Sequence, residues 1–103
     1  MNRTTPSLTL SDKVQGVYLL SGDLVYSTVP DFVKEGDSLL DLSLNQIVID
    51  CSAVKRLDSA GLSLFLEWKR QCQAANKQVS FTALPDQATS MLETFMLKDL
   101  LSQ

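Results

Sequence analysis

The sequence predicts an α/β domain whose elements follow the order strand, strand, helix, strand, helix, strand, helix (β-β-α-β-α-β-α). Two observations lead to this prediction. Short stretches of β-branched and apolar residues alternate with longer segments in which apolar residues recur at helical spacing. Strand-helix-strand units also require right-handed crossovers between parallel strands. We therefore expect a mixed four-stranded sheet, mostly parallel, with the first strand antiparallel at one edge and helices covering at least one face.

The first two strands are predicted to form a hairpin. Residues 7–11 alternate between polar and apolar side chains, and residues 16–20 form a second apolar run after a short turn at 13–15. Turn-forming residues at 21–23 are expected to end the second strand. We expect residues 1–6 to be a flexible N-terminus and residues 7–103 to form a single domain.

A first helix is expected to begin after Thr28, which is a favourable N-cap. Pro30 would stand in the first turn, and Asp31 would lie beside the positive end of the helix dipole. The apolar pattern continues to about Leu40. Gly36 weakens this helix by up to about 1 kcal/mol relative to Ala, so the helix is expected to end early or kink there.

The centre of the chain reads as a buried strand followed by a long helix. Residues 46–50 (Gln-Ile-Val-Ile-Asp) are apolar without alternation, as in a central strand covered on both faces. The second helix is expected to start near Ser59. Its core stripe consists of small, aromatic and aliphatic residues at helical spacing: Gly61, Leu64, Phe65, Trp68, Cys72 and Ala75.

The last strand and helix follow a turn at Asn76-Lys77. Residues 78–84 alternate and predict the fourth strand, after which Pro85-Asp86 opens a third helix. The apolar face of that helix is formed by Ala88, Met91, Leu92 and Phe95. Three leucines near the end, Leu97, Leu100 and Leu101, can pack either on this domain or on a partner.

Composition narrows the class of partner. The 103 residues carry 9 Lys and Arg against 12 Asp and Glu, a net charge of −3, and the pairs Lys55-Arg56 and Lys69-Arg70 are the densest basic spots. Neither pair is large enough to bind nucleic acid or an anionic membrane. No apolar run approaches the roughly 20 residues needed to span a bilayer, and the polar start does not resemble a signal peptide. We expect a soluble cytoplasmic protein with no direct membrane insertion.

The two cysteines, Cys51 and Cys72, are expected to be packing residues. One follows the predicted central strand and the other lies on the apolar stripe of the long helix. A disulfide between them stays open as an alternative, although a cytosolic setting argues against it.

The sequence lacks the residues on which most catalytic sites depend. It contains no histidine, and its glycines do not form a phosphate-binding loop. Ser59 has neither the setting nor the base partner of a hydrolase nucleophile. One alternative remains, in which Asp23, Asp50 and Asp58 gather at the carboxyl edge of the sheet and hold a divalent cation. We otherwise expect a protein that is not an enzyme and that uses no cofactor and no metal.

Residues 57–62 (Leu-Asp-Ser-Ala-Gly-Leu) mark the crossing from the central strand to the second helix. Free backbone N–H groups and a partial positive charge collect where a helix begins. In a purely structural interpretation, Asp58 or Ser59 caps the helix, a contribution of roughly 1 kcal/mol. In a functional interpretation, the same segment is a partner-binding surface made by Asp58, Ser59, Ala60, Gly61, Leu62 and Ser63.

Residues 47–50 (Ile-Val-Ile-Asp) followed by Leu-Asp-Ser-Ala-Gly-Leu at 57–62, in a chain of this length and element order, resemble the STAS domain of anti-sigma factor antagonists. The resemblance runs from about residue 8 to 101, and residues 21–24 are similar to the family's Gly-Glu-Leu segment. It implies a STAS-like fold. It also implies that Ser59 matches the phospho-acceptor of the family, on a face that docks on a kinase-like partner.

Other residues resemble a second branch of this family. Phosphorylated antagonists tend to carry Asp where this chain has Val25, and residues 64–68 and 83–87 are closer to the small STAS subunits of Mla phospholipid-transport ABC systems of Gram-negative bacteria. This resemblance implies a non-enzymatic cytoplasmic subunit, peripheral at the inner membrane, that binds and supports an ABC ATPase through the Ser59 region. The alternative is an anti-sigma factor antagonist whose partner kinase phosphorylates Ser59.

Overall fold

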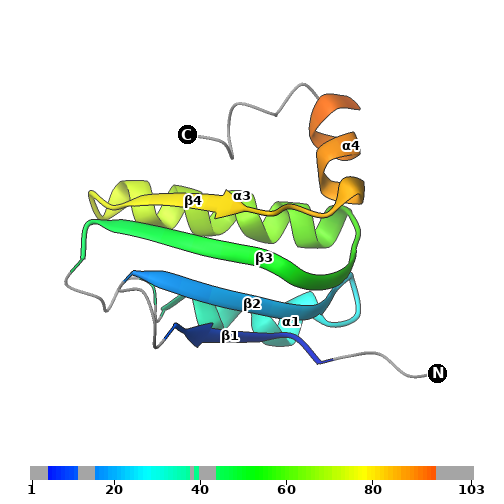
Figure 1. Cartoon of the computed structure of the whole chain (residues 1–103), viewed down its shortest axis with the longest axis horizontal. Coiled ribbons are helices and arrows are strands. Elements are labelled where there is room, and N and C mark those ends of the chain that lie inside the picture. Colours follow the sequence, from blue (N-terminus) through cyan, green and yellow to red (C-terminus); the bar gives the residue numbers. More distant parts are fainter. Residues whose placement is uncertain (1–4, 12–15, 38, 40–43, 95–103) are drawn as a thin grey trace.

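A single four-stranded sheet forms the framework of the protein, with its strands side by side in the order β1-β2-β3-β4 (Figure 1). The computed structural model describes residues 5–11, 16–37, 39 and 44–94. β1 is antiparallel to β2, whereas β2, β3 and β4 run parallel. The predicted mixed sheet with an antiparallel first strand is thus confirmed. The strands are β1 (Ser7–Leu10), β2 (Val17–Leu24), β3 (Gln46–Leu57) and β4 (Gln78–Thr82).

The helices follow the predicted order along the chain. They are α1 (Val29–Phe32), the 3-10 helix η1 (Val33–Gly36), α3 (Ser59–Ala74) and α4 (Asp86–Thr94). In Figure 1, α1 and α3 lie behind the sheet, α1 beneath β1 and β2 and α3 beneath β3 and β4, while α4 stands at the end of β4. None of the helices in the described ranges is long and apolar enough to cross a membrane.

The core lies between the sheet and the α1–α3 layer. Along β3, Ile47, Ile49 and Cys51 are almost completely buried, whereas Val48 and Asp50 between them are only half-buried. This alternation differs from the expectation of a strand covered on both faces, because the described helices cover one face. On the open face, Asp50 pairs with Leu19, whose side chain is 44% exposed.

β2 does not end at Leu20 as the sequence suggested, but continues to Leu24. The turn-forming residues at 21–23 produce two irregularities in the pairing with β3. Gly22 has a φ of +94°, which glycine adopts without strain. A β-carbon there would stand 2.7 Å from the Thr5 carbonyl oxygen, so the chain entering β1 passes against this glycine. Pairing with a long neighbouring strand has turned a local turn signal into a bulge.

β3 is likewise longer than predicted and runs 12 residues, to Leu57. The extension is paired with the bulged end of β2, through Gly22 with Val54 and Leu24 with Leu57. Val54 and Leu57 are both buried. The strand therefore delivers the chain directly to Asp58 at the start of α3.

Thr28 occupies the N-cap position of the first helix but makes no capping hydrogen bond with its side chain. Its hydroxyl instead donates to the Asp23 carbonyl at 2.7 Å and accepts from the Val25 N–H at 3.0 Å. The α-helix ends after Phe32 and tightens into η1, whose last residue is Gly36, the position at which an early end or a kink was expected. Of the predicted continuation to Leu40, Asp37 and Leu39 are described and both are helical, and the other two positions lie outside the described residues.

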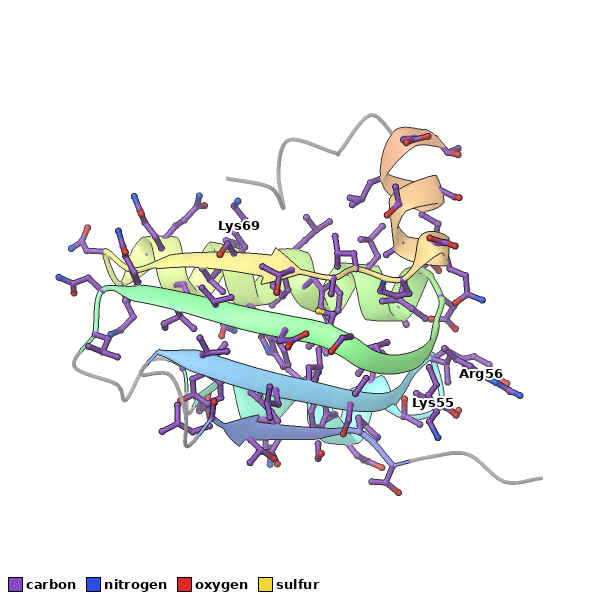
Figure 2. The ribbon with its side chains drawn as sticks, in the orientation of Figure 1. Lys55, Arg56 and Lys69 are labelled. Atoms are coloured by element: carbon purple, nitrogen blue, oxygen red, sulfur yellow. The ribbon has the colours of Figure 1, made fainter. Side chains whose placement is uncertain are left out.

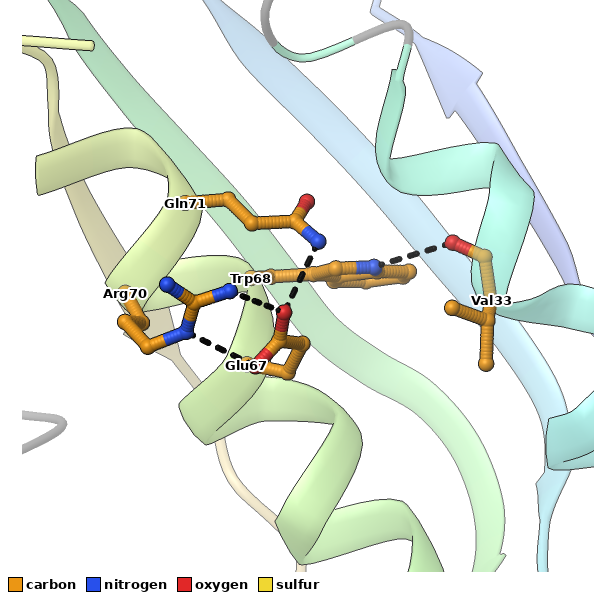
Figure 3. A network of polar contacts seen from close by, with 5 residues as sticks. All are labelled: Val33, Glu67, Trp68, Arg70 and Gln71. Atoms are coloured by element: carbon orange, nitrogen blue, oxygen red, sulfur yellow. Dashed lines mark hydrogen bonds and ion pairs between the residues drawn. The ribbon is translucent and has the colours of Figure 1, made fainter. Parts of the chain in front are cut away.

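One face of α3 is buried against the sheet, and its neighbouring surface carries a small polar network. Figure 3 shows the Trp68 indole N–H donating to the Val33 carbonyl of η1 at 3.4 Å. Glu67 accepts two bonds from Arg70, at 3.0 and 2.7 Å, and one from Gln71 at 2.9 Å. The buried residues are Gly61, Leu62, Leu64, Phe65, Trp68, Lys69 and Cys72.

The predicted stripe differs from the buried face of α3 in three residues. Ala75 is exposed at the C-cap, whereas Leu62 and Lys69 are buried although the stripe did not include them. Cys51 and Cys72 are free and buried, which confirms their expected role as packing residues. Asn76 then turns the chain with a φ of 62°.

The last helix buries Ala88 and Leu92, with Met91 packed against the core. The predictions for Phe95 and for Leu97, Leu100 and Leu101 lie outside the described residues, as does the turn expected at 13–15.

Candidate functional site

Asp58 is the residue that caps α3. Its backbone is extended, with φ −117° and ψ −168°, and its Oδ1 accepts the N–H of Ala60 at 2.8 Å and, more weakly, that of Gly61 at 3.4 Å. The sequence left the cap open between Asp58 and Ser59. The structure assigns it to Asp58, so the Ser59 hydroxyl has no part in capping.

The second carboxylate oxygen of Asp58 reaches a different element. Asp58 Oδ2 accepts the backbone N–H of Tyr26 at 3.0 Å, in the loop between β2 and α1. The Asp58 N–H donates to the Leu24 carbonyl at 3.2 Å, just before the same loop. One carboxylate therefore holds both the first turn of α3 and the β2–α1 loop, and it fixes these two surface segments relative to each other.

The six residues of the predicted partner-binding segment divide by exposure. Ser59 and Ser63 are exposed, Asp58 and Ala60 are half-buried, and Gly61 and Leu62 are buried. None of the described residues forms a hydrogen bond with the Ser59 hydroxyl. Only the two serines and the edges of Asp58 and Ala60 are therefore directly accessible from solvent.

Gly61 lets α3 approach the sheet closely. A β-carbon at this position would stand 2.5 Å from the Leu24 carbonyl oxygen and 3.0 Å from Leu57 Cγ. Leu62, which is 3% exposed, enters the core from the same turn. Both residues position the exposed serines by packing the helix start against the ends of β2 and β3.

Three exposed residues near this site, Tyr26, Lys55 and Arg56, were not predicted to belong to it. Tyr26 is 72% exposed, and its backbone is bound to Asp58. Lys55 and Arg56 are exposed near the end of β3, where Figure 2 shows their side chains projecting from the end of the sheet that leads into α3. Lys69 is 7% exposed and lies well away from them. The sequence did not indicate that β3 is long enough to pair Arg56 with Asp23, close to the β2–α1 loop that carries Tyr26.

Asp23, Asp50 and Asp58 do not form the divalent-cation site that the sequence allowed as an alternative. Asp50 lies in the middle of β3 because that strand runs on to Leu57, and its Oδ1 accepts the Ser52 N–H at 2.9 Å. This hydrogen bond lowers the pKa of Asp50. Asp23 and Asp58 lie instead at the carboxyl ends of β2 and β3. Across the described ranges, no group of three His, Cys, Asp or Glu side chains is arranged to hold a metal ion.

The candidate site lies outside three pockets formed by described residues. A pocket of about 310 Å³ lies between the chain before β1 and the start of the first helix, and neither Asp58 nor Ser59 lines it. Its lining residues are Thr5, Pro6, Ser27, Thr28, Asp31, Phe32 and Glu35. An exposed serine, an exposed tyrosine and two exposed cations near the start of α3 suit contact with another protein better than enclosure of a small molecule.

Comparison with known proteins identifies a protein family and a relative in sequence. Residues 9–102 match the family model described as "Mlab, STAS domain". Over 92 residues the chain is 29% identical to the intermembrane phospholipid transport system binding protein MlaB of Haemophilus influenzae, covering 86% of each chain.

Solved structures share the fold. The anti-sigma factor antagonist SpoIIAA in its unphosphorylated form is similar with a TM-score of 0.68 and 13% identity, over 91% of this chain and 84% of that one. The STAS domain of an antisigma-factor antagonist from Rhodobacter sphaeroides gives a TM-score of 0.63 and 21% identity, over 84% and 91%. At these identities the likeness concerns the fold alone.

Proposed function

This chain belongs to the STAS domain family, and we propose that it is a non-enzymatic subunit that binds and supports the ATPase of a phospholipid-transport ABC complex. Two findings support the proposal. The family match spans residues 9–102, and the similar MlaB protein is named as a binding protein of an intermembrane phospholipid transport system. In this role the protein would lie in the cytoplasm, peripheral at the inner membrane through its complex, and would serve outer-membrane lipid asymmetry.

The observation that carries the proposed docking site is the exposed Ser59 hydroxyl on the first turn of a rigidly capped helix. Asp58 satisfies the N–H groups of Ala60 and Gly61, so Ser59 is free to bond a partner. The site is preorganised, and little conformational entropy is lost when it docks.

A charge at Ser59 would act on binding rather than on folding. A phosphate adds about −1.5 to −2 charges, and the positive end of a helix favours such a charge by roughly 0.3–1 kcal/mol. Asp58 opposes this gain through repulsion. The fold should therefore tolerate a charge at this exposed position, while a partner surface packed against the serine would lose both fit and charge match.

The proposal is tested by measuring the affinity of the purified chain for the ATPase subunit of the phospholipid-transport system from the same organism. We expect Ser59→Glu to weaken binding by about tenfold or more, the effect of a charge in an interface. Ser59→Ala should weaken it less, by the loss of one hydrogen bond. Gln78→Glu is the matched control, because it adds the same charge at an exposed position at the start of β4.

A wild-type chain that does not bind the ATPase would refute the proposed function. If Ser59→Glu binds the ATPase as tightly as Gln78→Glu does, the proposed function stands and the docking site lies elsewhere.

The second candidate function is an anti-sigma factor antagonist switched by phosphorylation. The exposure of Ser59 favours it, since a kinase must reach the hydroxyl. Incubation with an anti-sigma factor kinase and ATP should then raise the intact mass by one phosphate, and Ser59→Ala should abolish the increase. An unchanged mass of the wild-type chain would eliminate this candidate.

A further inference from the structure

We propose that Tyr26 is the anchor of the docking surface and that the basic pair Lys55–Arg56 selects a partner surface with an apolar recess bordered by carboxylates. The inference rests on the proposed function and deepens it, because it names the chemistry of the protein surface that the Ser59 region meets. The docking patch is defined as Tyr26, Lys55, Arg56 and Ser59.

Among the large hydrophobic side chains in the described ranges, that of Tyr26 is the most exposed. Its side chain is 72% exposed, compared with 45% for Leu10, 44% for Leu19 and 38% for Val33. A tyrosine ring buries a large apolar area when a partner covers it, while its hydroxyl can still find a hydrogen bond. Tyrosine and arginine are also enriched among the residues that dominate binding energy.

The backbone of Tyr26 is held in place by the helix cap. Asp58 Oδ2 accepts its N–H at 3.0 Å, and the turn around it is closed by the Thr28 and Val29 N–H groups, which both donate to the Val25 carbonyl at 2.9 Å. The backbone that carries the ring is thus fixed relative to Asp58 at the start of α3. An anchor that is already positioned loses less freedom on binding than one on a flexible loop.

The charge of the docking patch is opposite to that of the chain as a whole. The protein has a net charge of −3, but Lys55 and Arg56 are both exposed and form no ion pair with a described residue. Figure 2 shows both side chains extending from the same end of the sheet. Carboxylates on the partner are therefore the complementary groups.

The patch suits a protein better than a nucleic acid or a lipid surface. Two cations neutralise too few phosphates for salt-resistant binding to nucleic acid, and anionic membranes require a larger basic cluster. An aromatic ring bordered by a hydroxyl and two cations has the composition of a protein–protein hot spot with a polar rim.

The anchor is tested with Tyr26→Ala and its control Leu19→Ala, which removes an exposed leucine on the open face of the sheet. We expect Tyr26→Ala to raise the Kd for the ATPase by about tenfold or more, as removal of an interface anchor does, and Leu19→Ala to leave it within about twofold. The far-ultraviolet circular dichroism of Tyr26→Ala should match the wild type, because the side chain makes few contacts within the protein.

The basic pair is tested with Arg56→Glu and its control Lys34→Glu, which changes the charge by the same amount at an exposed position in η1. The association rate of the wild type should fall as salt is raised, because screening weakens the attraction of opposite charges. Arg56→Glu should lower the rate and reduce this salt dependence, whereas Lys34→Glu should change the rate much less.

The outcomes separate this inference from the proposed function. If the wild type binds the ATPase but Tyr26→Ala binds as well as Leu19→Ala, or if salt accelerates association, the docking patch is wrong and the function stands. If the chain binds an anti-sigma factor kinase instead and Tyr26→Ala weakens that complex, the function is wrong and the patch stands. If the wild type binds neither protein, or binds nucleic acid or anionic vesicles more tightly, both are refuted.

Discussion

Gly36 lies against the indole of Trp68 so closely that a β-carbon at position 36 would overlap the ring. The contact joins η1 to the middle of α3. It is reinforced by the hydrogen bond from the indole to the Val33 carbonyl and by the Phe32 ring, whose centroid is 5.9 Å from that of Trp68. The absence of a side chain at position 36 thus lets the first helical segment close over the core.

Substitution of Gly36 by Ala should destabilise the protein by about 1–3 kcal/mol, the usual result of forcing an extra methyl into a packed contact. Urea unfolding measures the change. Trp68 is the sole tryptophan of the sequence, so its fluorescence reports on this contact directly. Lys34→Ala, in the same turn but exposed, is the control. Equal stability of the two variants would show that η1 moves aside without cost.

Asp58→Ala should lower the free energy of unfolding by about 1–3 kcal/mol, since it removes both the cap of α3 and the bond to the β2–α1 loop. Asp58→Asn keeps an oxygen for the cap but places an amide against the Tyr26 N–H, so we expect a smaller loss. Thermal unfolding of both variants beside Glu93→Ala, an exposed acid on α4, makes the comparison. Equal losses for Ala and Asn would mean that the loop bond matters more than the cap.

Acid should weaken the contribution of Glu67. Hydrogen bonds from Arg70 and then Gln71 lower the pKa of Glu67 from 4.5 to about 2. A carboxylate whose pKa is lower in the folded state adds stability above its unfolded pKa, and this stability is lost as the pH falls toward the folded value. The stability difference between wild type and Glu67→Gln should therefore be present at neutral pH and vanish between about pH 4.5 and 2.

This difference should also shrink in high salt, because the ion pair of Glu67 and Arg70 is exposed to solvent. A difference that grew on acidification would show that the pKa of Glu67 is raised rather than lowered.

Neither cysteine should react readily with thiol reagents in the folded protein. Burial, with a smaller effect from the nearby Asp50 charge, raises the pKa of Cys51 to about 12, and burial raises the pKa of Cys72 as well. Thiolate is the reactive form, so alkylation at mildly alkaline pH should be slow until denaturant is added. Mass spectrometry after timed alkylation gives the rates. Rapid labelling of Cys51 under native conditions would contradict its burial.

Element types and their order could be predicted because hydrophobic periodicity reports local structure. Strand ends were the weak point, and β2 and β3 show the cause. Ser21-Gly22-Asp23 has the composition of a turn, and residues 51–57 lack a strong strand pattern. Each segment becomes a strand by pairing with the other, as Gly22 does with Val54. That information belongs to residues distant in sequence, so local propensity cannot supply it.

The candidate site was predictable in its centre and not in its surroundings. The helix start near Ser59 and the place of Gly61 on the buried stripe were predicted from the sequence, and the structure agrees with both. The contact between Asp58 and Tyr26 spans 32 positions along the chain and depends on where β2 ends. The exposure of Tyr26 could not be predicted either, because an aromatic residue that follows an apolar strand is expected to be buried in the core.

Asp58 bonds the backbone of residue 26 and not its side chain. Substitutions at position 26 therefore differ in their effect on folding from substitutions at position 58. Any residue except proline can donate the N–H that Asp58 accepts, so the ring of Tyr26 is not needed to hold the β2–α1 loop against the start of α3. Position 26 can therefore be varied to retarget the protein toward a different partner at little cost in folding, whereas position 58 cannot. A library randomised at residue 26 alone would explore recognition on an unchanged scaffold.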